Sequence, residues 1–124
     1  LGALYVSDPK YNVDMFIGIG GGPEGVLAAS ALDSYNCHFQ GRFIFDNEKD
    51  IQQANSMGIK DLDKKYELNE IVKGDSIFCA TGITDSSFIK GITFDQDKYI
   101  SETLITHKNT NYKQLVKNVN SINE

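Results

Sequence analysis

A cluster of glycines limits what this chain can form near its start. Residues 18–25 read GIGGGPEG, and glycines at this density favour places where the backbone must come very close to another group. The helix predicted to open at Pro23 adds unpaired N–H groups, which favour an anion such as phosphate. The segment therefore predicts a ligand-binding loop. A tight strand-to-helix turn that binds nothing is the alternative.

The elements on either side of the glycines predict an α/β fold. Val13–Ile19 is a short apolar run ending in glycines, which is typical of a strand covered on both faces. Pro23 suits the first helical position, where its missing N–H is not needed. The predicted helix carries a wide apolar face made of Val26, Leu27, Ala28, Ala31, Leu32 and Tyr35.

The rest of the chain continues with short predicted elements in a βαβα order. They are the end of a helix over Leu1–Val6, a turn at Asp8-Pro9, a strand over Cys37–Phe45, a helix from Asp46 or Asn47 to Met57 that stops at Gly58, a turn or two of helix over Leu68–Val72, a buried strand over Ser76–Ala80, and antiparallel strands at Thr93-Phe94 and Tyr99–Thr106. Tyr112–Ile122 is short and polar with some helical spacing, so its state stays open. We expect one mixed sheet flanked by helices, with Met15–Ile19 and Ser76–Ala80 as adjacent or near-adjacent inner strands.

Composition narrows the class of partner. The net charge is -5 and Arg42 is the single arginine, which argues against nucleic acid or an anionic membrane as the main partner. No apolar run approaches the roughly 20 residues that a membrane span needs. Cys37 and Cys79 match neither a disulfide framework nor a zinc site, so we expect reduced, partly buried thiols. A small, solvated ligand fits best.

Two kinds of site fit the glycine loop. Gly20–Gly25 satisfies GxGxxG and Asp46 lies 21 residues beyond Gly25, as in a dinucleotide-binding fold. Glu24 opposes that interpretation, because its carboxylate would repel a pyrophosphate. The same carboxylate suits a divalent metal that bridges to phosphate. No lysine follows the glycines, which excludes a P-loop.

At these residues the chain strongly resembles the class II fructose-1,6-bisphosphatases of the bacterial glycerol-operon type. Their GIGGxPEGV segment reads here as Gly18–Val26, with Gly22 at the variable place. Ser86-Ser87 departs from the family, which usually has a glycine after the acid, and this weakens the idea that the turn touches ligand. Further matches follow in the family's order: Gln40-Gly41-Arg42, Met57-Gly58-Ile59, Asp61, Ala80–Asp85, Lys90-Gly91-Ile92 and Glu102-Thr103-Leu104.

The resemblance implies roles for a few residues. Glu24 corresponds to a metal ligand, for Mn²⁺ or Mg²⁺, and Gly21 to a residue that contacts the bisphosphate. Gly20, Gly22, Thr81 and Asp85 are possible neighbours of the site. No catalytic residue is expected within residues 1–124, since the family's other metal carboxylates and its basic phosphate-binding run lie upstream of the matching region.

The resemblance also implies a setting for the chain. Residues 1–124 are expected to form a single C-terminal domain or fragment of a layered, lithium-sensitive phosphatase-like fold. The longer enzyme would remove the 1-phosphate of fructose 1,6-bisphosphate in gluconeogenesis and glycerol metabolism, in the cytoplasm and as a homo-oligomer, and this piece alone would be inactive. Its partners would be the sugar bisphosphate and the missing N-terminal part. A nucleotide-binding module without hydrolytic activity is the alternative.

Four polar residues are ambiguous from sequence. Asp85 ends a predicted strand and is equally suited to the ligand crevice and to capping a turn. His38 and His107 are isolated, so a surface or hydrogen-bonded role is favoured over that of a catalytic base. Arg42 stays unassigned.

Overall fold

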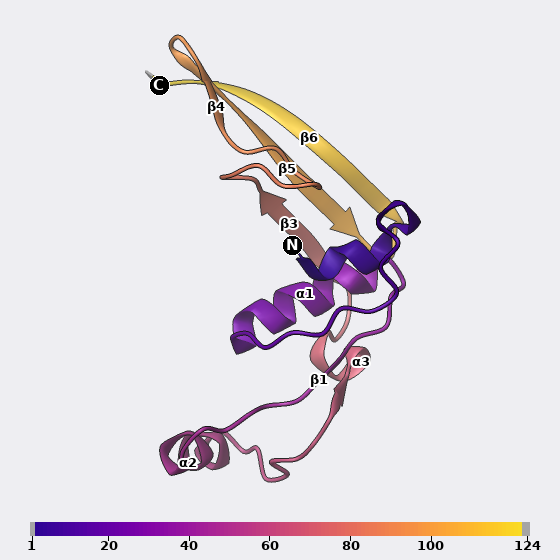
Figure 1. Cartoon of the computed structure of the whole chain (residues 1–124), viewed down its shortest axis with the longest axis vertical. Coiled ribbons are helices and arrows are strands. Elements are labelled where there is room, and N and C mark those ends of the chain that lie inside the picture. The colour runs from indigo at the N-terminus through magenta and orange to yellow at the C-terminus, as the bar shows by residue number, and fades with distance from the viewer. Residues whose placement is uncertain (1, 123–124) are drawn as a thin grey trace.

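The computed structural model describes residues 2–122 and contains a sheet with one long helix on it, plus a slender extension that carries a second helix (Figure 1). The elements in chain order are η1 (Gly2–Ser7), η2 (Pro9–Tyr11), α1 (Gly22–Ser34), β1 (Gln40–Gly41), α2 (Glu48–Ser56), β2 (Tyr66–Glu67), α3 (Leu68–Ile71), β3 (Ile77–Thr81), β4 (Thr93–Asp95), β5 (Lys98–His107) and β6 (Tyr112–Ser121). The α/β class is therefore confirmed.

All strand pairs in the described residues are antiparallel, so the predicted mixed sheet is wrong in that respect. β5 lies at the centre and pairs with β3, β4 and β6. The predicted β4–β5 hairpin is confirmed, with Gln96 at φ 53° in its turn. The segment left open in the sequence, residues 112–122, is mostly β6, because ten of its residues pair with β5. Cross-strand pairing decides its state where local spacing did not.

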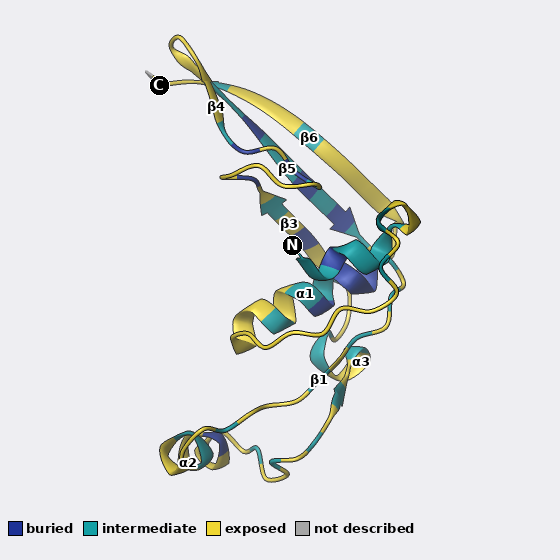
Figure 2. Cartoon of the chain, in the orientation of Figure 1, coloured by how far each residue is buried: buried dark blue, intermediate teal, exposed yellow. Residues whose placement is uncertain are grey.

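The helix α1 begins where the sequence predicts. Gly21 is its N-cap and a proline occupies its first turn, while Gly25 N donates to Gly21 O at 3.0 Å. The C-terminal half is buried, with Ala29, Ala31 and Leu32 at most 3% exposed. The N-terminal half is largely exposed (Figure 2), so the predicted apolar face is covered only in part.

The apolar run before the glycines is not a strand, which overturns the expected inner strand over Val13–Ile19. Residues 15–20 are irregular and exposed, and Ile17 and Ile19 are 86% and 88% exposed. No strand pairs with them among residues 2–122. A run of this kind becomes a buried strand only when neighbours bond its backbone and cover both faces. The apolar pattern of residues 13–19 indicates that they can form a strand, but it does not show whether the neighbouring strands are present.

The second predicted strand is also much shorter than expected. Within Cys37–Phe45, only Gln40–Gly41 pairs, with Tyr66–Glu67. The following helix is confirmed as α2: the Asn47 side chain accepts from Asp50 N at 3.0 Å, and Gly58, at φ 88°, lies just beyond the helix end. The caps at the two ends of α2 come from residues next to the helix, so they could be read from the local sequence. The predicted strand instead depended on a second strand long enough to pair with all of it, and β2 pairs with only two of its residues.

The remaining short elements differ modestly from expectation. The first turns form the 3-10 helix η1, and Leu1 of the predicted Leu1–Val6 helix lies outside the described residues. The predicted strand over Ser76–Ala80 is present as β3, but the expectation of a buried inner strand is wrong. Among the described strands β3 pairs with β5 alone, and it is covered on one face only, since Phe78 is 8% exposed and Ile77 is 65% exposed. A sheet with one bare face explains this alternation.

The core lies where α1, η1 and the loop after β3 meet the sheet. It contains Leu4, Ala31, Leu32, Phe78, Ile89 and Leu104. Ile89 is 1% exposed although it belongs to the loop between β3 and β4. The loop is thus held by an apolar anchor as well as by backbone contacts.

Ile89→Ala is expected to lower the free energy of unfolding by about 2–5 kcal/mol, because it removes buried methyl groups and leaves a cavity. Ile83→Ala, in the same loop but 70% exposed, is the matched control and is expected to stay within about 0.5 kcal/mol of the parent. Urea denaturation followed by circular dichroism measures both. Equal effects of the two substitutions would show that the loop does not contribute to the core.

Candidate functional site

The glycine loop and Glu24 form a compact exposed unit at the N-terminal end of α1. Gly21 is extended, at φ −67° and ψ 155°, and Glu24 lies in the first helical turn. Residues 20–24 are all exposed. Early helical N–H groups have no intrahelical acceptor, so this end of α1 presents free donors next to a carboxylate.

Gly21 and Glu24 are close in space as well as in sequence. A Cβ atom added at Gly21 would collide with Glu24 Oε2 and lie 3.3 Å from Glu24 Cδ. The Glu24 carboxylate therefore folds back over the glycine, into space that any other residue would fill. The backbone conformation of Gly21 is open to all residues, and the Glu24 carboxylate is the end of a flexible, exposed side chain that can move aside, so the described chain alone does not require glycine at this position.

The donor set at Glu24 fits a hard divalent cation only as part of a larger site. A carboxylate oxygen is a suitable ligand for Mg²⁺ or Mn²⁺. Within residues 2–122, however, no three His, Cys, Asp or Glu side chains gather in a way that could hold a metal ion. Glu24 can thus supply one ligand, and any further protein ligands must come from elsewhere.

Thr81 and Asp85 lie in and just after β3, and their polar contacts serve their own surroundings. Thr81 Oγ1 lies 2.9 Å from Thr103 Oγ1 on the neighbouring strand. Asp85 Oδ1 accepts from Gly91 N at 2.9 Å and so closes the loop between β3 and β4. The capping role that the sequence left open for Asp85 is therefore present in the structure.

Two glycines allow that loop to close tightly. A Cβ on Gly82 would collide with Lys90 O and lie 2.9 Å from Ile89 Cγ2, and a Cβ on Gly91 would lie 2.8 Å from Ile83 O. The beginning and the end of the loop between β3 and β4 are thus in backbone-to-backbone contact. The predicted neighbours Thr81 and Asp85 belong to this loop and strand end, which Figure 1 shows apart from the N-terminal end of α1. The described chain does not bring these two groups together.

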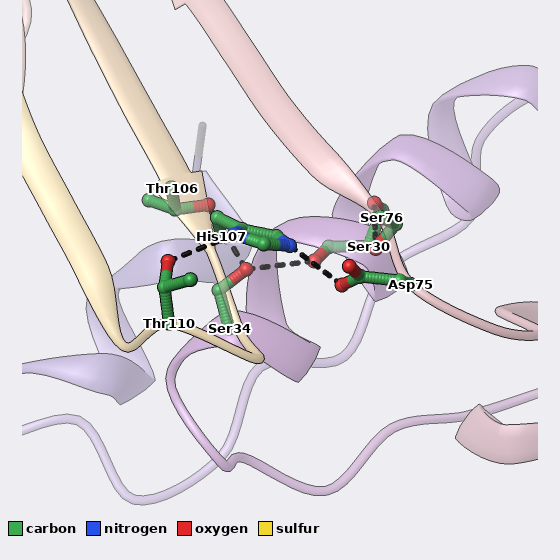
Figure 3. Close-up of polar contacts among 7 residues, drawn as sticks. All are labelled: Ser30, Ser34, Asp75, Ser76, Thr106, His107 and Thr110. Atoms are coloured by element: carbon green, nitrogen blue, oxygen red, sulfur yellow. Dashed lines mark hydrogen bonds and ion pairs between the residues drawn. The ribbon is translucent and has the colours of Figure 1, made fainter.

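His107 is hydrogen-bonded in a structural network, in agreement with the favoured sequence interpretation. Its Nε2 lies 2.6 Å from Asp75 Oδ1 and its Nδ1 lies 2.8 Å from Thr110 Oγ1, so the ring joins the start of β3 to the turn after β5 (Figure 3). Beside it, Thr106 Oγ1 donates to Ser34 Oγ at 2.9 Å, which links β5 to α1. Both ring nitrogens are engaged, which leaves neither free to act on a bound ligand.

Sequence reasoning missed a polar cleft between α1 and the β1–β2 extension. The cleft has a volume of about 440 Å³ and includes Asp33 and Lys108 in its wall. Lys108 Nζ donates to Asp33 Oδ1 at 2.5 Å, and the Asp33 side chain is 10% exposed. These residues are 75 positions apart, so nothing local in the sequence pairs them. Because the Lys108 ammonium is already paired with the Asp33 carboxylate, it is a weak anchor for a phosphate.

We expect the purified 124-residue chain to show no saturable binding of Mn²⁺ below millimolar concentration, because a lone exposed carboxylate is a weak ligand for a hard cation. Glu24→Gln is expected to leave the titration unchanged. Isothermal titration calorimetry with MnCl₂ measures both. Tighter binding that disappears in Glu24→Gln would contradict this expectation and would show that the chain holds a complete metal site.

Comparison with known proteins identifies a family for the sequence that contains the glycine loop. The model of the bacterial glpX-encoded fructose-1,6-bisphosphatase family matches residues 1–122. The chain is similar to the D-fructose 1,6-bisphosphatase class 2/sedoheptulose 1,7-bisphosphatase of Prochlorococcus marinus strain AS9601, at 36% identity over 103 residues that cover 72% of this chain and 31% of the relative. It is also similar to the protein of the same name from Trichormus variabilis, at 35% identity over 96 residues, covering 67% of this chain and 28% of the relative.

These matches give the family of the chain and the share of its relatives' length that it covers. It spans about a third of the length of the curated relatives it matches. No helix in residues 2–122 is long and apolar enough to cross a membrane. Because the family match extends through the GIGGGPEG loop and on to the last strand, the chain belongs to the bacterial glpX-type, class 2 fructose-1,6-bisphosphatase family.

Proposed function

We propose that this chain contributes the glycine loop and one metal-ligand carboxylate to a class 2 bisphosphatase that removes the 1-phosphate of fructose 1,6-bisphosphate. The observation that carries the proposal is the Glu24 carboxylate folded over Gly21 at the start of α1, within a segment that the family model covers. Two curated relatives are named for sedoheptulose 1,7-bisphosphate as well, so that sugar is a second candidate substrate.

Each part of the loop has a defined role in this proposal. A divalent cation, Mn²⁺ or Mg²⁺, when bound, activates water and offsets charge on the phosphate oxygens. Glu24 supplies one oxygen ligand from a rigid helical turn. Gly21 has no side chain, so its backbone can approach the bisphosphate closely once the carboxylate turns toward the cation. The free N–H groups of α1 favour the phosphate electrostatically.

The rest of the site would come from the polypeptide outside the matched region. Gly20 and Gly22 flank the loop and are proposed as its near neighbours, whereas Thr81 and Asp85 would approach it only in the complete assembly. We further propose that the complete enzyme has the layered, lithium-sensitive phosphatase-like fold, acts in the cytoplasm in gluconeogenesis or glycerol metabolism, and is a homo-oligomer. The 124-residue chain alone is proposed to be inactive.

The dinucleotide-binding alternative loses its structural support in this chain. The GxGxxG pattern needs a strand that leads directly into the glycines, and residues 15–20 form none. Asp46 lies in an exposed segment before α2, not at the end of a regular strand. The bisphosphatase proposal needs neither feature.

A chimera tests the proposal: this chain replaces the matching C-terminal third of the Prochlorococcus marinus relative. We expect metal-dependent phosphate release from fructose 1,6-bisphosphate, and Glu24→Gln is expected to lower kcat/KM by about 100-fold or more, because a neutral amide is a poor ligand for a hard cation. High Mn²⁺ concentration should restore part of the activity, since a weakened site refills by mass action. Steady-state phosphate release measures both effects.

Glu48→Gln is the matched control, because Glu48 is an exposed glutamate in the first turn of α2, the next α-helix along the chain. It is expected to leave kcat/KM within about twofold of the parent chimera. A metal dependence that Glu24→Gln does not alter, together with tighter NAD binding by that variant, would overturn the bisphosphatase assignment in favour of a dinucleotide site.

A further inference from the structure

The polar cleft beside the C-terminal end of α1 is built from separate parts of the chain. Its wall includes Asp33 of α1, residues 36–39 after the helix, residues 67–69 around the start of α3, and Lys108 after β5. Its volume of about 440 Å³ lies in the range of small-molecule sites. None of these residues belongs to the glycine loop, so a ligand of the cleft is separate from the bisphosphate proposed there.

Asp33 is the most buried residue of the cleft wall. Its side chain is 10% exposed, and its Oδ1 accepts from Lys108 Nζ at 2.5 Å. Its Oδ2 has no partner among the described residues, although no fully buried side-chain oxygen of a non-exposed residue lacks one there. The Oδ2 atom is therefore open to the cleft, where it can accept a hydrogen bond from a ligand.

Three more polar residues of the cleft wall have side chains without a partner in residues 2–122. They are Asn36, His38 and Asn69. A side-chain amide and a neutral imidazole each donate and accept hydrogen bonds. Such groups are ordinarily left to water on a convex surface, but these line one concave space together with an open carboxylate oxygen. A ligand that enters the cleft can therefore form several hydrogen bonds at once.

The charges in the cleft wall are mixed, and this selects the charge of the ligand. The Lys108 ammonium opposes a cation, whereas the carboxylates of Asp33 and Glu67 oppose an anion. Because both donors and acceptors line the cleft, the matching ligand is neutral and carries groups that can do both. Hydroxyl groups have this property. The half-buried Phe39 adds an apolar part of the wall for the C–H groups that lie between hydroxyls.

We propose that this cleft is a binding site for a neutral monosaccharide. The hydroxyl groups of the sugar donate to Asp33 Oδ2 and accept from Lys108 Nζ and from the side-chain amides of Asn36 and Asn69. A phosphorylated sugar is disfavoured by the carboxylates of the wall. The cleft therefore distinguishes a free sugar from its phosphate. This inference goes beyond the proposed function and is independent of it, since it uses none of residues 18–26.

NMR titration of the 124-residue chain tests the proposal. The ¹⁵N-labelled chain is titrated with D-glucose or D-fructose and, separately, with glucose 6-phosphate. We expect saturable shifts centred on the amides of residues 36–39 and 67–69. The expected Kd for the neutral sugars is about 1–10 mM, because a small polar ligand in an open cleft gains little binding free energy per atom. Glucose 6-phosphate is expected to bind there at least about fivefold more weakly.

Two substitutions and one control identify the binding groups. Asn69→Ala is expected to weaken the binding of neutral sugar by about fivefold, because it removes one hydrogen-bonding side chain. Asn55→Ala is the matched control, since Asn55 is an exposed asparagine of α2 outside the cleft wall, and Kd is expected to stay within about twofold. Asp33→Asn removes the charge that pairs with Lys108, so the preference is expected to reverse in favour of glucose 6-phosphate. Thermal unfolding of each free variant shows whether it remains folded.

Three results would overturn the sugar site. The first is the absence of saturable shifts in residues 36–39 and 67–69 with both neutral sugars at about tenfold above the expected Kd. The second is equal or tighter binding of glucose 6-phosphate by the unsubstituted chain, which would identify an anion site. The third is an equal loss of binding in Asn69→Ala and Asn55→Ala. Because the glycine loop reports at residues 20–25, failure of the sugar site and failure of the proposed function are distinguishable.

Discussion

The packing of the C-terminal half of α1 on β3 and β5 holds this structure together. Leu32 of α1 lies in one cluster with Phe78 of β3 and Leu104 of β5. Beside the cluster, Ser34 and Thr106 form a buried hydrogen bond, which fixes the helix along the strand direction. An apolar contact alone is non-directional, whereas a hydrogen bond between buried hydroxyls is satisfied in one arrangement only. The orientation of α1, and with it the position of the glycine loop, follows from this contact.

The sequence predicted those elements whose specification is local. The start of α1 at a proline, the Asn47 cap and the Gly58 stop of α2, and the β4–β5 hairpin all depend on residues within a few positions of one another. The expected strands over residues 13–19 and 37–45 failed because a strand depends on a partner at an unspecified distance along the chain. β6 was left undecided for the same reason, and its ten-residue register with β5 settles it.

The candidate site shows the same difference between residues that are close in the sequence and residues that are far apart. The glycine loop and Glu24 are neighbours in sequence, and their close approach in space follows from one helical turn. Thr81 and Asp85 were expected near that loop because strand ends in a layered sheet tend to meet. The expected inner strand that would have placed the loop beside β3 is absent, and Asp85 instead closes its own loop on Gly91. The chemistry of the site stays a prediction from sequence, and the absent strand pairing is the reason that its expected geometry is not formed in the described chain.

The slender extension that carries α2 has few backbone bonds to hold it in place. β1 and β2 pair over only two residues each, and α2 lies at the far end from the sheet (Figure 1). Ala54 is the buried residue of α2, and the small pocket beside it is lined by residues of the extension alone, among them Phe43 and Phe45. Such an arm can unfold, lengthen or accept an insertion at little cost to the rest of the chain, because loop closure entropy grows only slowly with length. An insertion into this arm is therefore expected to leave the α1–sheet packing of this chain, and the loop that it positions, unchanged.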